Sequence, residues 1–194
     1  MVAAVILAAG SSKRLGQPKA LLDFGGSPLV LDLVLRLGSS GLEISPIIVV
    51  VNEDIAAEVE SILGGTKAGV VVNKSPETGR TGSLKLGLAE LLGAEAVLVI
   101  PVDRPGWAMS TLRILTEADN CCCPSRERKG GHPLRLEPDD IARIIAAPDS
   151  ERLNRLVDPS HFEVEDQFLH LNIDTLDDLP LLAAAASRLA QTKF

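Results

Sequence analysis

One stretch decides the fold: the apolar run Val2–Leu7 leads directly into the loop Leu7-Ala8-Ala9-Gly10-Ser11-Ser12-Lys13-Arg14-Leu15-Gly16-Gln17-Pro18-Lys19. A short continuous run rich in valine and isoleucine is typical of a strand that is buried on both faces, as in a parallel sheet. Open sheets of this kind bind ligands in the crevice outside the carboxyl ends of their strands. The stretch therefore predicts a parallel α/β sheet with a binding site in its first loop.

Strand and helix patterns alternate through the first half of the chain. Such alternation implies right-handed βαβ crossovers. We predict one domain over residues 1–194 with an α/β fold, a three-layer α/β/α sandwich around a Rossmann-like, mostly parallel sheet with a small antiparallel part. The expected strands are Val2–Leu7, Pro46–Val51, Gly69–Val72 and Ala96–Val102, and the expected helices are Pro28–Leu37, Ile55–Leu63 behind Asp54 as N-cap, and Gly82–Leu92.

The second half is less regular. A helical pattern closes the chain, with Thr175 as its N-cap, and the basic, glycine-rich segment Arg126–Gly131 predicts a loop. Further helices are expected at Trp107–Ala118, Glu137–Ala147, Ser150–Val157 and Leu176–Leu189, and strands at Cys121–Pro124, Phe162–Val164 and Gln167–Ile173, with the last two expected to be antiparallel.

Composition excludes several classes of protein. The chain has a formal net charge of −7, and aromatic residues make up only 3% of it. A negative charge and few stacking side chains argue against a nucleic-acid partner, and no apolar run is long enough for a membrane span. The three cysteines are adjacent, at Cys121–Cys123, so they cannot form a disulfide framework and favour a reducing, cytoplasmic location. On a strand, they would serve as small buried apolar residues.

The first loop has the chemistry of a phosphate site. Its small residues let the backbone approach a ligand closely, and its N–H groups can cradle phosphate oxygens. Arg14 and Lys19 suit an electrostatic clamp on a triphosphate. The loop is neither a Walker A sequence nor a dinucleotide fingerprint, because Gly10 and Gly16 are too far apart and no Gly-Lys-Ser/Thr follows. The alternative to a phosphate site is a flexible surface loop with two solvated cations.

The complete loop resembles the nucleotidyltransferase signature of enzymes that activate small phosphorylated acceptors with an NTP, and above all that of the molybdenum cofactor cytidylyltransferases, within the MobA-like NTP transferase family. The resemblance implies a Rossmann-like α/β domain that uses Mg²⁺, transfers NMP and releases pyrophosphate. It implies catalytic roles for Arg14 and Lys19. The residues it places on the nucleotide are Leu7, Ala8, Ala9, Gly10, Ser11, Ser12, Arg14 and Lys19.

A second segment, Thr78–Leu88, resembles the part of the family sequence that borders the nucleoside. Gly82 and Ser83 are expected where a loop enters a helix, a place where backbone donors and a hydroxyl can read a base or ribose. The resemblance implies that both bind the nucleotide. Helix capping by Ser83 is the alternative, and capping can coexist with ligand contact.

A third segment, Val99–Pro105, predicts an apolar strand that ends in a carboxylate. Asp103 offers the hard oxygen ligand that Mg²⁺ needs, and the matching Asp-x-Pro of the family holds the metal. Arg104 stands where the family usually has Gln or Met, so nearby substrate contacts are expected to differ. The alternative for Asp103 is an Asx turn before Pro105.

A fourth segment, Leu171–Leu179, resembles the family's Asn/Asp-Ile-Asp-Thr-Pro-Glu-Asp-Leu. Asn172 and Asp174 alternate along an expected strand end, so both should point to one face. We favour Asp174 as the second Mg²⁺ ligand opposite Asp103, with Asn172 as the alternative ligand. Asp174 and Thr175 could instead only cap the last helix.

The prediction of the residues that bind the acceptor rests on a weaker match, Gly131-His132-Pro133. Similar enzymes carry Gly-His-Pro here, which implies that His132 and Arg126 face the acceptor, with Arg128 and Lys129 completing a cationic rim for its phosphate. A solvated basic turn is the alternative. The family's Gly-Asp-x-Gly is absent from the segment that follows, which leaves the acceptor less defined than the NTP.

The expected function is transfer of CMP from CTP to a phosphorylated small molecule, molybdopterin by resemblance. Ala9 stands where guanylyl-transferring relatives usually have Gly, and its methyl group favours the smaller pyrimidine. The alternatives are a sugar or polyol phosphate as acceptor, and a chaperone that binds the nucleotide or cofactor without turnover. The resemblance also implies a molybdoenzyme or its chaperone as a protein partner, and a monomer or weak oligomer.

Overall fold

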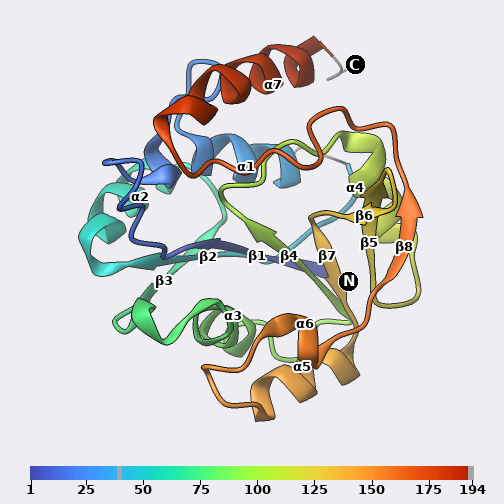
Figure 1. Ribbon diagram of the computed structural model, residues 1–194. Coiled ribbons are helices and arrows are strands. Elements are labelled where there is room, and N and C mark those ends of the chain that lie inside the picture. The colour runs from blue at the N-terminus through green and yellow to red at the C-terminus, as the bar shows by residue number, and fades with distance from the viewer. Residues whose placement is uncertain (39–40, 192–194) are drawn as a thin grey trace.

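The computed structural model describes residues 1–38 and 41–191 (Figure 1). Its parallel strands are those that the continuous apolar runs predict. They lie in the order β3-β2-β1-β4, and every pair of neighbours is parallel. Their bounds are β1 (Val2–Ala8), β2 (Ile47–Asn52), β3 (Gly69–Asn73) and β4 (Ala96–Pro101).

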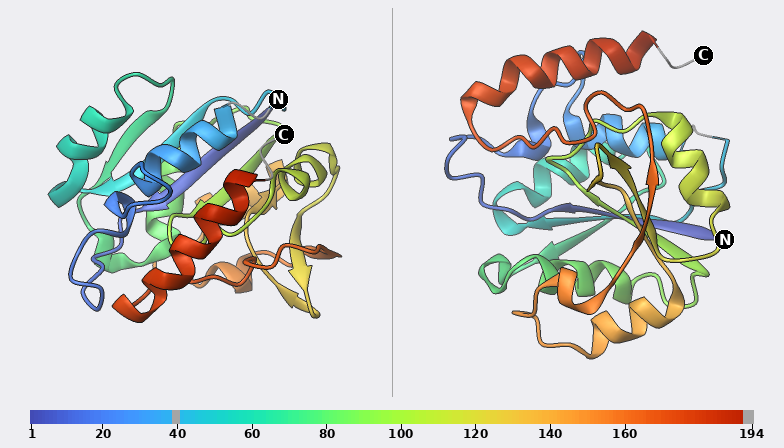
Figure 2. Two further views of the ribbon diagram at one scale, coloured as in Figure 1. Left: turned by 90° about the horizontal axis from the view of Figure 1, so that it is seen from above. Right: turned by 45° about the vertical axis from the view of Figure 1, so that its right-hand side comes forward.

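A second group of short strands extends the sheet beyond β4, at one edge of the parallel part (Figure 2). β7 runs antiparallel to both β4 and β5, and β6 forms a hairpin with β5. β8 pairs with β5 in parallel. The bounds are β5 (Cys122–Arg126), β6 (Lys129–Gly130), β7 (Leu134–Leu136) and β8 (Ser160–Glu163).

Helices cover both faces of the sheet (Figure 1), which confirms the three-layer sandwich. One face carries α1, α2, α4 and α7, and the other carries α3, α5 and α6. Their bounds are α1 (Leu29–Gly38), α2 (Ala56–Leu63), α3 (Arg80–Ala89), α4 (Met109–Glu117), α5 (Pro138–Ala146), α6 (Leu153–Leu156) and α7 (Leu179–Gln191), with 3₁₀ turns at Lys19–Leu21, Glu53–Ile55, Pro76–Thr78 and Leu176–Asp178.

The hydrophobic core has two parts, one on each face of the sheet. Alternate residues of β1 divide between them: Ala4 and Ile6 pack under α1 and α7, whereas Ala3 and Val5 pack against α3. This division follows from the two-residue repeat of a strand. Because both faces are covered, β1 and β4 are apolar at nearly every position.

Several boundaries differ from the sequence expectations. Asp54 lies inside a 3₁₀ turn, so it is not the N-cap of α2. The expected loop Arg126–Gly131 contains a tight hairpin, in which Arg126 pairs with Lys129. The expected helix over Ser150–Val157 contracts to the single turn α6, and α4 begins at Met109, two residues after Trp107.

The largest difference lies in Gln167–Ile173, which forms turns and irregular backbone instead of a strand. Its amides bond locally, from Leu169 to the carbonyl of Asp166 and from Leu171 to the carbonyl of Phe168. Ile173 donates to the carbonyl of Asp103 at 3.1 Å. The segment thus crosses to the end of β4 and joins no neighbouring strand. The strand expected at Phe162–Val164 exists as β8, but it is parallel to β5.

In the part of the chain that the structure describes, no helix has the length and apolar character needed to span a membrane.

Candidate functional site

The loop after β1 is organised by Ser12, a non-glycine residue with a positive φ of 47°. The Ser12 carbonyl accepts hydrogen bonds from the amides of Leu15 at 3.0 Å and Gly16 at 3.2 Å. Its hydroxyl accepts one from the amide of Lys19, also at 3.2 Å. Residues with short polar side chains tolerate the left-handed region best, and this conformation turns the loop so that Lys19 returns to the end of the sheet.

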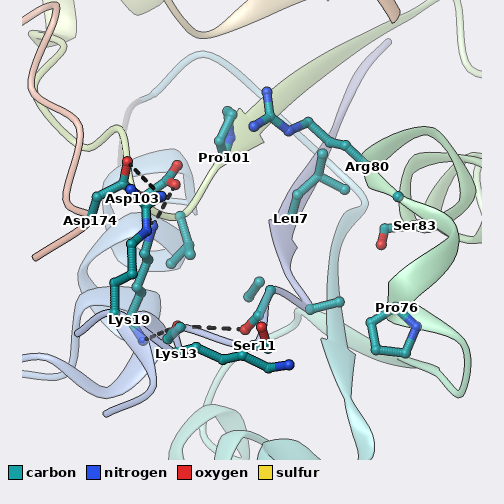
Figure 3. Close-up of a pocket in the computed structure, with 17 residues that line it drawn as sticks. Leu7, Ser11, Lys13, Lys19, Pro76, Arg80, Ser83, Pro101, Asp103 and Asp174 are labelled. Carbon is teal, nitrogen blue, oxygen red and sulfur yellow. Dashed lines mark hydrogen bonds and ion pairs between the residues drawn. The ribbon is translucent and has the colours of Figure 1, made fainter. Parts of the chain in front are cut away.

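This loop borders a cavity of about 390 Å³ where β1 and β4 end. Figure 3 shows Lys19, Asp103 and Asp174 on one side of it, with Arg80 and Ser83 on the other. The structure therefore brings together most of the residues predicted for the NTP. The predicted residues that line the cavity are Leu7, Ala8, Ala9, Gly10, Ser11, Ser12, Arg14, Lys19, Ser83, Asp103 and Asp174, and the further lining residues are Lys13, Pro76, Gly79, Arg80, Pro101 and Val102.

An ion-pair cluster lies at one end of the cavity. The Lys19 ammonium donates to Asp103 Oδ2 at 3.0 Å and to Asp174 Oδ1 at 2.7 Å. The Arg14 guanidinium, largely exposed, lies 3.4 Å from Asp174 Oδ2. The hydrogen bond from Lys19 lowers the pKa of Asp174 and is the largest cause of that shift. Both carboxylates thus face one cation from two separate segments of the chain.

The same two carboxylates are suited to a divalent cation. Asp103 and Asp174 bind one ammonium through oxygens, and oxygen ligands with room for water and phosphate are what Mg²⁺ prefers. The cluster includes no third acidic, cysteine or histidine side chain at metal-binding spacing among the described residues. Water and phosphate oxygens would therefore have to complete the coordination shell.

The structure separates the roles of Asn172, Asp174 and Asp178. The Asn172 amide donates to Asp174 Oδ2 at 2.7 Å, so Asn172 orients Asp174 and is not among the residues that line the cavity. Asp178, not Asp174, completes the capping box with Thr175. Asp178 Oδ2 accepts from the amides of Asp174 and Thr175, both at 2.8 Å. The expected strand is absent, yet the Asp174 side chain remains available to the cavity.

The start of α3 forms the wall of the first cavity opposite the ion-pair cluster. Gly79 has a φ of 108°, a conformation that strongly favours glycine, and α3 begins at Arg80. Ser83 therefore lies inside the first turn and is not the N-cap. Its hydroxyl accepts a hydrogen bond from the Asn73 amide at 2.9 Å. Gly82 does not line this cavity but a separate one on the outer side of α3.

A second cavity of about 760 Å³ adjoins the first, and Gly79 and Arg80 line both. His132 lines it, as expected for the acceptor side. Arg126 does not: its guanidinium donates to the carbonyl of Asp166 at 3.2 Å. Arg128 and Lys129 at the β5–β6 hairpin are also not among the lining residues.

His132 is a neutral imidazole in this setting. Burial lowers its pKa to about 4, and the positive charges of Arg104 and Arg80 add to the shift, while Asp103 opposes it. Its Nδ1 atom is buried without a hydrogen-bond partner among the described residues.

Sequence reasoning missed Arg80. It borders both cavities, and no hydrogen bond or ion pair joins its side chain to a residue that the structure describes. A signal existed, since Arg80 follows Gly79 directly in the segment that resembles the nucleoside border. Recognising it required knowing that the helix begins there.

The cysteines behave largely as expected. Cys122 packs into the core part under α4, and Cys123 packs into the part on the other face of the sheet. Burial raises the pKa of all three thiols, that of Cys121 to about 12. Cys123 also lines the second cavity.

Comparisons with known proteins agree with this geometry. Residues 4–165 match the MobA-like NTP transferase domain. A 2-C-methyl-D-erythritol 4-phosphate cytidylyltransferase from Streptomyces coelicolor is 29% identical over 175 residues, 83% of this chain and 64% of that protein. A molybdenum cofactor guanylyltransferase from Xanthomonas euvesicatoria is 28% identical over 134 residues, 69% of this chain and 64% of that protein.

Solved structures show the same fold. Rv0371c from Mycobacterium tuberculosis has a TM-score of 0.78 and 25% identity, with 94% of this chain and 97% of that chain covered. The present chain spans less than two thirds of the length of both curated relatives named above. The family match itself extends from within β1 to beyond β8, and therefore over the loop and the end of β4, while Asp174 of the first cavity lies outside it. The chain belongs to the MobA-like NTP transferase family.

Proposed function

We propose that the protein is a nucleotidyltransferase that moves CMP from CTP onto a small phosphorylated acceptor and releases pyrophosphate. One observation carries the proposal: Lys19 joins Asp103 and Asp174 at the end of a cavity bordered by the first loop. Charge neutralisation and positioning are what phosphoryl-type transfer requires of a protein. The family match supports the reaction class.

The nucleotide would enter the cavity with its phosphates along the loop after β1. The residues at positions 8–12 are small, so their amides can approach phosphate oxygens closely. Arg14 and Lys19 would face the β- and γ-phosphates and stabilise the pyrophosphate as it leaves. Removing one such preorganised charge typically slows an enzyme ~10²-fold or more.

The reaction needs no strong general base. An oxygen of the acceptor phosphate forms a bond to the α-phosphorus, while the bond from that phosphorus to the bridging oxygen breaks and its electrons leave with pyrophosphate. The attacking phosphate is already anionic near neutral pH. Mg²⁺ held by Asp103 and Asp174 would supply Lewis-acid neutralisation of the phosphate charges. Asn172 keeps the Asp174 carboxylate oriented through its hydrogen bond.

The choice of CTP rests on Ala9 and on the relatives. Ala9 is buried, lines the cavity, and has its carbonyl bonded to the Asn52 amide at 3.3 Å. Its methyl group leaves less room for a purine than a glycine would. One methyl group alone accounts for only ~1–3 kcal/mol, so polar groups near Ser83 must contribute the remaining discrimination.

The acceptor has two candidates. Molybdopterin is the first, supported by the resemblance of the four motifs and by the guanylyltransferase relative. A polyol phosphate is the second, favoured by the methylerythritol phosphate cytidylyltransferase that matches 83% of this chain. A nucleotide-binding chaperone without turnover is less favoured, because both carboxylates are present and face the same cavity.

Pyrophosphate release tests the proposal. Purified protein with Mg²⁺ is given each of CTP, GTP, ATP and UTP, with molybdopterin or 2-C-methyl-D-erythritol 4-phosphate as acceptor. We expect release with CTP and one acceptor, and at least ~10²-fold loss in Asp103→Asn, whose amide is a neutral and weaker ligand. Faster turnover with GTP would replace the cytidylyl assignment, and absence of release with every pair would favour the chaperone.

A further inference from the structure

The two cavities meet at Arg80, and this side chain has no hydrogen-bond or ion-pair partner among the described residues. Its guanidinium extends toward Pro101 at the end of β4 (Figure 3). It lines the smaller cavity, where the α-phosphorus of the nucleotide would lie, and the larger cavity, which has room for an acceptor. Arg80 forms no hydrogen bond or ion pair with a described residue. An arginine so placed has its donors available to a ligand that extends from one cavity into the other.

Two more groups bear on this junction, namely His132 in the lining of the larger cavity and Arg104, which lines neither cavity. The His132 imidazole lines the larger cavity, and its buried Nδ1 lacks a hydrogen-bond partner in the described part of the chain. Arg104, the residue after Asp103, likewise has a side chain with no hydrogen bond or ion pair to described residues. The charges of both arginines act on the imidazole.

We propose that Arg80 and His132 bind the phosphomonoester of the acceptor at the junction of the two cavities, and that the charge of Arg104 strengthens this binding from outside the lining. This inference rests on the proposed nucleotidyl transfer and specifies which chemical group of the acceptor is held, and where. A phosphate there has one side toward the cavity that contains Asp103 and Lys19, while the rest of the acceptor occupies the larger cavity. The Arg80 guanidinium supplies paired N–H donors that match phosphate oxygens.

The proposal replaces the cationic rim expected from the sequence. Arg126 is engaged with the carbonyl of Asp166, and neither Arg128 nor Lys129 lines the larger cavity. It also gives a function to Arg104, the residue that departs from the usual Gln or Met of the family. Its positive charge near His132 would favour an acceptor whose reacting end is a dianion.

Histidine NMR tests the site without requiring turnover. The full chain, with ¹⁵N-labelled histidine rings, is first saturated with Mg²⁺ and a non-hydrolysable CTP analogue, so that the first loop is filled. Methyl phosphate is then added, and the ring signals of His132, His161 and His170 are followed. We expect saturable shifts at His132. Arg80→Gln should weaken methyl phosphate binding by ~10-fold or more, the usual effect of losing a hydrogen bond to a charged group. Arg104→Gln should weaken it less, because only a nearby charge is lost.

Arg126→Gln is the matched control, and it should leave the affinity for methyl phosphate unchanged. Arg104→Lys keeps the charge and should retain part of the affinity, which separates charge from misfolding. An unmoved His132 signal, or equal weakening by Arg126→Gln, overturns the inference. If the CTP analogue itself does not bind, the proposed function fails. The same titration without nucleotide then decides the phosphate site on its own, by whether Arg80→Gln weakens binding.

Discussion

At the residue scale, Lys19 lies between Asp103 and Asp174, where the proposed function would put a divalent cation. Both contacts are short, 3.0 and 2.7 Å, and the Lys19 side chain is only 15% exposed. Two carboxylates that face each other repel strongly when no cation lies between them. If the proposed metal site is correct, the ammonium competes with metal for the same oxygens in the absence of nucleotide, and it becomes available to the phosphates when it is displaced.

Lys19→Met should consequently have two opposite effects. We expect turnover to fall ~10²-fold or more because a preorganised charge is lost. We also expect nucleotide-free protein to bind Mn²⁺ more tightly, because the metal no longer displaces an ammonium. Electron paramagnetic resonance measures free Mn²⁺ directly. Lys85→Met is the matched control, because Lys85 pairs with Asp149 at 2.7 Å outside the carboxylate cluster. Unchanged or weaker Mn²⁺ binding in Lys19→Met would refute the competition.

Arg36 acts on the site from a buried position. It pairs with Asp32 one helical turn away at 2.9 Å and stacks 3.9 Å from the Trp107 ring centroid. Its guanidinium donates to the carbonyls of Pro105 at 2.9 Å and Trp107 at 3.0 Å. Burial lowers its pKa to about 10, with Asp32 opposing the shift, so it stays charged at neutral pH. It thereby fixes the backbone that follows Asp103.

Arg36→Lys should raise the Mg²⁺ concentration needed for half-maximal activity, because lysine keeps the charge but cannot hold both carbonyls. The loss of a planar, stacked donor should also cost ~1–3 kcal/mol of unfolding free energy. Arg135→Lys separates the two effects. Arg135 is equally buried and donates to Glu137 and to the carbonyl of Leu115. We expect Arg135→Lys to lower the unfolding free energy without changing the Mg²⁺ dependence of activity. If both variants raised the Mg²⁺ concentration needed for half-maximal activity equally, the role of Arg36 would be purely structural.

At the scale of elements, β5 carries Cys122 and Cys123 as buried packing residues, and the half-buried Cys121 directly precedes it. Because burial raises all three pKa values, little reactive thiolate is present at pH 8. Native protein should react with a disulfide reagent far more slowly than urea-unfolded protein, measured by release of the coloured thiol. Rapid modification of one thiol in the native state would instead indicate a reactive cysteine and revive a redox or metal role.

Comparison of the strands with the segment 167–173 shows which parts of the fold could be predicted from the sequence. β1 to β4 follow from continuous apolar runs, because strands covered on both faces need apolar residues at nearly every position. The segment 167–173 could not be assigned correctly, since its path depends on a distant residue: a Cβ at Gly106 would lie 1.9 Å from the Phe168 carbonyl oxygen. Only glycine at position 106 permits that approach, and no local pattern in 167–173 reports it.

The residues of the candidate site could likewise be predicted from the sequence only in part. The loop after β1 and Asp103 could be found from sequence because each directly follows an apolar strand. Asp174 required the resemblance, since its meeting with Asp103 depends on the hydrogen bond from the Ile173 amide to the Asp103 carbonyl. The junction at Arg80 could not be found, because a cavity arises only when β7 and α6 pack beside the start of α3.

At the scale of the whole molecule, the site depends on how closely α3 lies against the sheet. Gly87 sets this distance: a Cβ at that position would come within 2.6 Å of a Val5 methyl group and 3.0 Å of a Val50 methyl group. Both valines belong to central strands in the core and cannot move without repacking their neighbours. Arg80 and Ser83 at the start of α3 therefore reach the cavity only because a glycine two turns later lets the helix approach.

Gly87→Ala should accordingly destabilise the whole fold although alanine is the better helix former. Intrinsic helix propensity favours alanine by ~1 kcal/mol, whereas forcing a methyl group into a packed core costs ~1–3 kcal/mol, so the net change should be a loss. Gly65→Ala is the control, because nothing lies within 4 Å of its Cβ position and its φ is not positive. Urea unfolding compares the two variants. A lower urea midpoint for Gly87→Ala, together with weaker CTP binding because α3 has moved outward, would confirm that the position of the helix and the site are coupled. A stabilised Gly87→Ala protein would show that the side chains around position 87 can repack to accept the methyl group.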